Sequence, residues 1–203
     1  MLSNCKHQDD LVLYEYSLDA PKRIIDIGAS DGVNGSNSRL FIDLGWDALL
    51  IEPQAEKYKE LSVNANYNGG GNVVCINAAI SAHDGETDFL FNRVVNDHSR
   101  IPNENYYSER FGDTPTELIK VDCMTLDTLF VLYPDFKDLG ILSIDTEGYD
   151  EVILQELMKT DVRPHVIICE HHTEAVRKRQ KAILTDYIQV RKISNNIIYK
   201  WIQ

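Results

Sequence analysis

Three acidic residues follow short apolar runs in this chain, and acids in such positions can accept hydrogen bonds, take protons or bind a cation. They are Glu52, Asp145 and Glu170. If the runs are parallel strands of an open α/β sheet, all three acids lie beyond the carboxyl ends of the strands, where ligands bind. A single such acid often only caps the next helix, but three of them beside a glycine turn indicate a functional site.

The glycine turn lies in the segment Arg-Ile-Ile-Asp-Ile-Gly-Ala-Ser-Asp-Gly, residues 23–32. A dinucleotide-binding turn has glycines at its first, third and sixth positions, so that the backbone can approach a pyrophosphate. Here the first position is Gly28, but Ser30 and Val33 occupy the third and sixth, and the second glycine is Gly32. The loop therefore favours a nucleoside ligand without phosphates and disfavours a nicotinamide dinucleotide.

Glu52 is far enough downstream of the turn to end the neighbouring strand. There its carboxylate can accept hydrogen bonds from both hydroxyls of a ribose. A nucleoside ligand without phosphates indicates S-adenosylmethionine as the cofactor. For this segment alone, the alternative is an ordinary tight turn between a strand and a helix.

The elements that position these residues follow from the apolar periodicity and the turn residues. We expect strands at 24–28, 47–51, 72–80, 117–122, 140–145 and 164–170, helices at about 36–45, 53–66, 125–132, 148–158 and 173–184, and a C-terminal hairpin of 187–193 with 197–202. A further strand at 85–92 breaks the alternation, so residues 85–122 are expected to be an insertion. Within it, the polar and aromatic stretch 93–116 fits either a lid over the site or a disordered loop.

The composition favours one intracellular domain. With 203 residues, the chain is expected to be a single domain, residues 1–203, with 1–20 as an N-terminal extension. A formal net charge of −12 argues against a nucleic-acid partner. The sequence has neither a signal-peptide pattern nor a run of about 18 apolar residues, so we expect no membrane partner. Because its four cysteines are not closely paired, we expect a cytoplasmic location.

Several motifs together resemble the FkbM family of S-adenosylmethionine-dependent methyltransferases. They are residues 23–32, Ile51-Glu52-Pro53, Thr125-Leu126-Asp127, the segment Ser-Ile-Asp-Thr-Glu-Gly-Tyr-Asp at 143–150, and Ile167-Ile168-Cys169-Glu170. The resemblance spans roughly residues 23–170, in the family's order. It implies an α/β fold of the Rossmann-like class I methyltransferase type, with a mostly parallel seven-stranded sheet whose last two strands form a hairpin.

The resemblance also assigns roles to residues. The cofactor-binding set that it implies is Asp26, Gly28, Ala29, Ser30, Gly32, Glu52, Pro53, Ala78, Ala79 and Asp145. In this set the glycine loop surrounds the methionine end of the cofactor, Glu52 takes the ribose, and Ala78 and Ala79 lie near the adenine. Asp145 faces the reaction centre. Ser30 departs from the family pattern, in which asparagine is more common at this position.

The implied reaction is methyl transfer to an oxygen of a small molecule, such as a sugar or a secondary metabolite. A hydroxyl acceptor must lose its proton, and the candidate groups at this sheet edge are Asp145, Glu147, Glu170, His171 and His172. Asp145 is the first choice. Glu147 and Glu170 are equally suited to fixing loops through backbone hydrogen bonds.

Three alternatives stay open at this point. A divalent cation held by Asp145, Glu170 and His171 could activate the acceptor, although catalysis without a metal is favoured. The chain could also be a noncatalytic nucleoside-binding module that has lost its acceptor site. A nicotinamide-dependent oxidoreductase is disfavoured by the glycine spacing.

Overall fold

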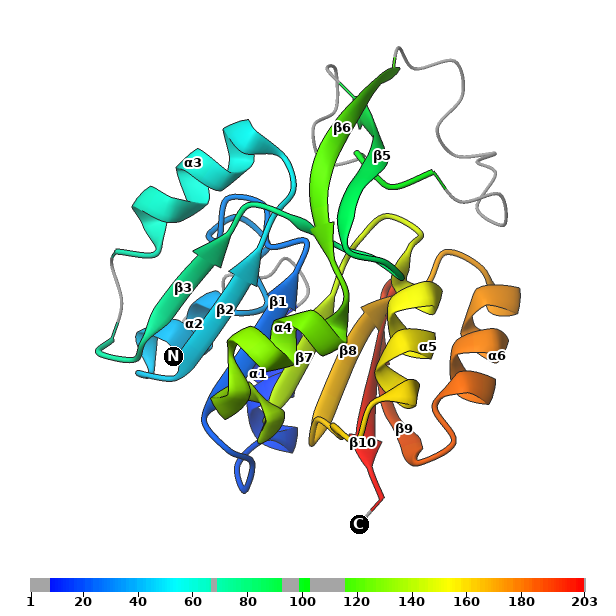
Figure 1. The fold of residues 1–203 in the computed structure, drawn as a ribbon. Helices are drawn as coiled ribbons and strands as arrows, with labels where there is room; N and C mark the ends of the chain where they lie inside the picture. Colours follow the sequence, from blue (N-terminus) through cyan, green and yellow to red (C-terminus); the bar gives the residue numbers. More distant parts are fainter. Residues whose placement is uncertain (1–7, 67–68, 93–98, 103–115, 203) are drawn as a thin grey trace.

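The computed structural model describes residues 8–66, 69–92, 99–102 and 116–202. Its main sheet has seven strands in the order β3-β2-β1-β7-β8-β10-β9 (Figure 1). The strands are β1 (Arg23–Ile27), β2 (Asp47–Ile51), β3 (Val73–Ile76), β7 (Ile141–Ile144), β8 (Val166–Glu170), β9 (Tyr187–Ile193) and β10 (Asn196–Trp201). β10 runs antiparallel to both of its neighbours, β8 and β9, and it forms a hairpin with β9. The expected Rossmann-like sheet with a C-terminal hairpin is confirmed.

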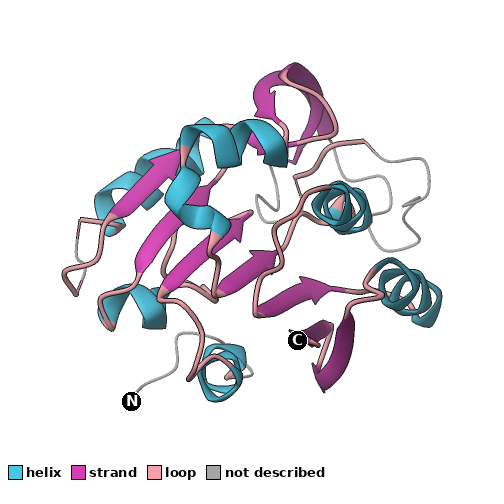
Figure 2. Cartoon of the chain, turned by 60° about the horizontal axis from the view of Figure 1, so that its bottom comes forward, coloured by secondary structure: helices cyan, strands magenta, loops and turns pink. Residues whose placement is uncertain are grey.

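Helices cover both faces of the sheet (Figure 2). They are α1 (Asp9–Tyr16), α2 (Arg39–Asp43), α3 (Ala55–Asn64), α4 (Leu126–Leu132), α5 (Asp150–Lys159) and α6 (Glu174–Ile183), with a short 3₁₀ helix, η2 (Pro134–Lys137), after α4. Successive strand residues point to opposite faces of the sheet. Ile24 belongs to the core between the sheet and helices α1 to α3, and Ile25 to the core between the sheet and helices α4 and α5. This double burial explains why the central strands are continuously apolar.

A second, smaller sheet lies above the carboxyl ends of the main strands (Figure 1). It contains β4 (Ala79–Ile80), β5 (Gly85–Asn92) and β6 (Thr116–Met124) in the order β4-β6-β5, with β5 and β6 antiparallel. The predicted strands at 85–92 and 117–122 are therefore confirmed. Most of the expected lid, 93–116, lies outside the described residues.

The prediction of one strand over 72–80 is wrong. β3 ends at Ile76, and β4 begins at Ala79 in the other sheet. Between them, the Asn77 side-chain amide donates to the carbonyl oxygens of Glu52 and Pro53 at 2.8 and 3.1 Å. These bonds fix the chain where it leaves the main sheet, and they place Ala78 beside the end of β2.

Buried contacts fix the first two helices. The N-terminal extension contains α1, whose Leu13 is fully buried against the sheet. At the start of α2, the Ser36 hydroxyl accepts the backbone N–H of Arg39 at 3.0 Å, whereas the Ser38 hydroxyl donates to Asp26. The Ser36 hydroxyl thus satisfies the first backbone N–H of α2, while Ser38, the N-cap residue, holds the buried carboxylate of Asp26 in β1.

Candidate functional site

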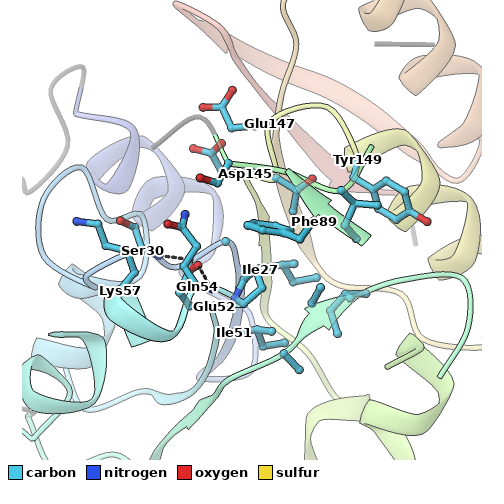
Figure 3. Close-up of a pocket in the computed structure, with 18 of the residues that line it drawn as sticks. Ile27, Ser30, Ile51, Glu52, Gln54, Lys57, Phe89, Asp145, Glu147 and Tyr149 are labelled. Carbon is cyan, nitrogen blue, oxygen red and sulfur yellow. Dashed lines mark hydrogen bonds between the residues drawn. The ribbon is translucent and has the colours of Figure 1, made fainter. Parts of the chain in front are cut away.

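A cavity of about 390 Å³ lies where β1, β2 and β7 end, beneath the second sheet (Figure 3). The main sheet contributes the ends of its strands and the loops that follow them. The second sheet contributes Ala79 and Ile80 of β4 and Phe89 of β5. The cavity therefore occupies the place that the sequence predicts for a ligand, at the carboxyl edge of a parallel sheet.

The glycine loop is packed so tightly that its glycines are required. Gly28 has φ of +86°, and a Cβ on it would lie 1.9 Å from the backbone oxygen of Asp145. Gly32 has φ of +73°, and a Cβ there would lie 2.5 Å from Leu61 Cδ1. Ser30 also adopts the left-handed region, with φ of +49°. Such a conformation is uncommon for serine and better tolerated by asparagine, so this turn stores backbone strain at the cavity wall.

Glu52 lies against the glycine loop. Its carboxylate accepts the backbone N–H of Ser30 at 2.9 Å and that of Gln54 at 2.8 Å, one bond at each oxygen (Figure 3). The side chain lines the cavity and is only 4% exposed. Burial raises the pKa of Glu52 to about 7, even though both amide bonds favour the charged form. Each oxygen keeps a further lone pair for a ligand donor.

Asp145 follows β7, and its backbone N–H donates to the Ile27 carbonyl oxygen at 2.9 Å. Its side chain is open to the cavity, although dense protein surrounds it. This surrounding protein raises the pKa of Asp145 well above its usual range, and the nearby carboxylates of Glu170 and Glu147 raise it further. A carboxylate of raised pKa can accept a proton from a weak acid at neutral pH.

The loop between β7 and α5 is held by Asp150, a residue to which the sequence assigns no role. Its carboxylate accepts the Thr146 hydroxyl at 2.6 Å and the Glu170 backbone N–H at 3.2 Å. It therefore ties the end of β7 to the end of β8. Burial is the main reason that the pKa of Asp150 rises to about 6.

The adjacent histidines lie in different surroundings. His171 is buried, with its Nδ1 2.6 Å and its backbone nitrogen 2.7 Å from the Asn195 carbonyl oxygen. His172 Nε2 lies 3.0 Å from a Glu170 oxygen and 4.0 Å from a Glu147 oxygen. The structure thus gathers His172 with the two glutamates, whereas His171 contacts the C-terminal hairpin.

The predicted site residues fall into two groups. Those that line the cavity are Gly28, Ser30, Glu52, Pro53, Ala78, Ala79, Asp145 and Glu147, and those that do not are Asp26, Ala29, Gly32, Glu170 and His171. Asp26 lies behind the loop, where burial raises its pKa and its carboxylate accepts the Ser38 hydroxyl at 2.5 Å. Asp26 can thus act on a ligand only by shaping the loop.

Sequence reasoning missed several lining residues, among them Asp31, Lys57, Phe89 and Tyr149. Lys57 lies in the first turn of α3, shortly after Glu52 in the sequence. This nearness to Glu52 is a signal that sequence inspection could have used. Phe89 belongs to a recognisable strand, but only the placement of the second sheet brings it over the cavity.

Comparison with known proteins gives one family and many structures of the same fold. The family model described as the methyltransferase FkbM domain matches residues 26–196. No curated protein matches the chain significantly. Within the described residues, no helix is long and apolar enough to cross a membrane.

Three similar solved structures illustrate the fold. A precorrin-6y C5,15-methyltransferase from Geobacter metallireducens GS-15 is 14% identical, with a TM-score of 0.51, 95% of this chain covered and 87% of the other. A putative RNA methyltransferase from Pyrococcus horikoshii is 14% identical, with a TM-score of 0.51 and coverages of 97% and 83%. The magnesium protoporphyrin IX methyltransferase from Synechocystis PCC 6803, solved with S-adenosylmethionine, is 9% identical, with a TM-score of 0.50 and coverages of 96% and 78%. At these identities the likeness is one of fold.

Proposed function

The chain belongs to the FkbM methyltransferase family, and we propose that it transfers a methyl group from S-adenosylmethionine to a hydroxyl oxygen of a small molecule, such as a sugar or a secondary metabolite. The observation that carries this proposal is that Glu52 and Asp145, from the ends of two different strands, line one cavity. One acid suits the nucleoside and the other suits the acceptor.

The electrostatic character of the cavity supports a cationic, phosphate-free ligand. Among the described residues, four acids line it, Asp31, Glu52, Asp145 and Glu147, against one lysine, Lys57. A sulfonium ligand is attracted by this surplus of acids, whereas a pyrophosphate is repelled by it. The residues present therefore fit S-adenosylmethionine better than a nicotinamide dinucleotide.

Glu52 would hold the nucleoside through its ribose. Each carboxylate oxygen already accepts one backbone N–H, so the carboxylate is fixed in orientation before a ligand arrives. Its remaining lone pairs can each accept one ribose hydroxyl. Because the same carboxylate fixes Ser30, ribose binding is linked to the conformation of the glycine loop.

Asp145 would act as the general base. When bound, S-adenosylmethionine supplies a methyl group on a sulfonium sulfur, which an aligned nucleophile displaces. The Asp145 carboxylate takes the proton of the acceptor hydroxyl as the oxygen–carbon bond forms, and its raised pKa suits this transfer. The wall formed by Ile80, Phe89 and Tyr149 is suited to excluding water from this end of the cavity.

A labelled-methyl assay tests the proposal. The protein is incubated with methyl-labelled S-adenosylmethionine and a panel of glycans and hydroxylated metabolites, beside the Asp145→Asn variant. We expect label in an ether linkage of at least one acceptor, and a loss of about 100-fold or more in the variant. Binding of the cofactor without transfer to any acceptor class would instead favour a noncatalytic nucleoside-binding module.

A further inference from the structure

A second group of side chains meets beside the cavity. Glu147 lies in the loop after β7, Glu170 is the last residue of β8, and His172 follows two residues later. Their side chains are 17%, 13% and 12% exposed. Each offers one ligand atom, and the three atoms lie within 4.8 Å of one another. Elements far apart in sequence thus place two carboxylates and an imidazole around one point.

Two of the separations between these atoms are close to those around a metal ion. Divalent transition metals lie about 2.1 Å from nitrogen and oxygen ligands, so neighbouring ligands at right angles are about 3 Å apart and opposite ligands about 4 Å apart. His172 Nε2 lies 3.0 Å from Glu170 Oε2 and 4.0 Å from Glu147 Oε2. The three residues can therefore take neighbouring and opposite positions around one ion with little movement.

The surrounding charge favours a cation at this point. The charged groups that act on the nearby Asp145 include four further carboxylates, those of Glu170, Glu147, Asp150 and Asp26. Within this cluster, a single protonated imidazole would offset only one negative charge. A divalent ion would offset two and would be held by ligands from two different strand ends.

We propose that Glu147, Glu170 and His172 bind a divalent transition-metal ion, with Mn²⁺ as the representative ion. Two carboxylates and one neutral imidazole suit such an ion better than Mg²⁺, which prefers oxygen ligands alone and a larger number of retained waters. This set replaces the grouping of Asp145, Glu170 and His171 considered from the sequence, since His171 contacts Asn195 instead.

The ion would contact the acceptor, a role that rests on the proposed function. Glu147 belongs to both the cluster and the cavity wall, so an ion bound by it lies at the acceptor end of the cavity. Three protein ligands leave coordination positions open, and a hydroxyl bound at one of them is more acidic than a free hydroxyl. Asp145 then takes a proton that the ion has already made easier to remove.

Mn²⁺ binding to the chelator-treated, full-length protein tests the site without any methyl acceptor. Titration followed by electron paramagnetic resonance of free Mn²⁺ is expected to show one saturable site per chain. Glu170→Gln and His172→Gln should each weaken binding by about 10-fold or more. Glu156→Gln is the matched control, because Glu156 lies on α5 and pairs with Lys159 at the surface; it should leave Mn²⁺ binding unchanged.

Two further readouts make the outcome decisive. Electron spin-echo spectroscopy of Mn²⁺ bound to the unmodified protein should show coupling to one imidazole nitrogen. Binding of S-adenosylhomocysteine to the unmodified protein tests the proposed cofactor separately from the metal. The same binding by each variant shows that the variant is folded. The absence of a saturable site, the absence of nitrogen coupling, or Mn²⁺ affinity in both site variants equal to that of the unmodified protein would each overturn the proposal. Methyl transfer that a chelator leaves undiminished would overturn the role of the ion at the acceptor.

Discussion

The backbones of Gly28 and Asp145 are in close contact, which joins the glycine loop to the proposed base. A Cβ at Gly28 would lie 1.9 Å from the Asp145 backbone oxygen. The contact arises because β1 and β7 are adjacent and parallel, so their ends meet at the same edge of the sheet. The geometry of the glycine loop thus determines where the acid of β7 can lie.

Gly28→Ala should destabilise the protein and reduce methyl transfer together. The left-handed backbone alone costs about 1–2 kcal/mol for a residue with a Cβ, and the collision with Asp145 adds to this. Gly35→Ala is the matched control, because Gly35 also has a positive φ of +71° but nothing lies within 4 Å of an added Cβ. Urea unfolding should give a clearly larger loss for Gly28→Ala; equal losses would show that the contact is unimportant.

Ser30→Asn should be neutral or slightly stabilising. Ser30 is held at φ +49° with its N–H bonded to Glu52, and asparagine adopts this region more readily than serine. Ser30→Val should lose about 1–3 kcal/mol, because a β-branched side chain is strained there. Thermal unfolding of both variants checks this order of stabilities, and a valine variant as stable as the wild type would contradict the prediction.

The stability of the ligand-free protein should fall as the pH rises from about 5 to about 8. The pKa of Glu52 is about 7 in the folded state against an ordinary value of 4.5, so between these values the folded state binds more protons than the unfolded state. The stabilisation is complete below about pH 4.5 and is lost as the pH rises through 7. The groups of lowered pKa, such as Glu174 at about 2, titrate below this window.

Urea unfolding at a series of pH values measures this dependence. Glu52 alone can contribute up to about 3 kcal/mol over the window, by the usual conversion of a pKa difference into free energy. Asp150, whose pKa is raised to about 6, acts in the same direction. A stability that rises between pH 5 and pH 8 would contradict the assignment of these buried acids.

Asp145→Asn should abolish the pH dependence of turnover that arises from the base. In the wild type the rate should rise with pH as the Asp145 carboxyl group, whose pKa is raised, loses its proton. The variant should be slower by about 100-fold or more, with S-adenosylhomocysteine affinity nearly unchanged. Single-turnover rates between pH 5 and pH 9 provide the check, and an unaltered profile would assign the proton transfer to another group.

Much of this architecture follows from local sequence. The continuous apolar runs of β1, β2, β7 and β8 predict a parallel sheet covered on both faces, and the hairpin of β9 and β10 follows from its turn residues. The capping of α4 by Thr125, whose hydroxyl accepts the Thr128 N–H at 3.1 Å, was also predictable from residue type.

What could not be predicted depends on contacts between distant segments. The break after Ile76 depends on Asn77 reaching the end of β2, and nothing in the apolar run itself marks it. His171 and His172 are chemically identical neighbours beyond a strand end, so only the position of the C-terminal hairpin distinguishes them. In the same way, Phe89 reaches the cavity because the second sheet lies over the first.

Calorimetric titration with S-adenosylhomocysteine tests the central claim, that Glu52 holds the nucleoside of a methyltransferase cofactor, most directly. We predict one site per chain in the wild type and the same affinity in Glu56→Ala, since Glu56 is exposed on α3. Glu52→Ala should bind about 100-fold more weakly, the loss expected for two hydrogen bonds to a charged acceptor. A nicotinamide dinucleotide should not bind. Binding of the dinucleotide alone, or equal affinity of Glu52→Ala and wild type for S-adenosylhomocysteine, would contradict the account.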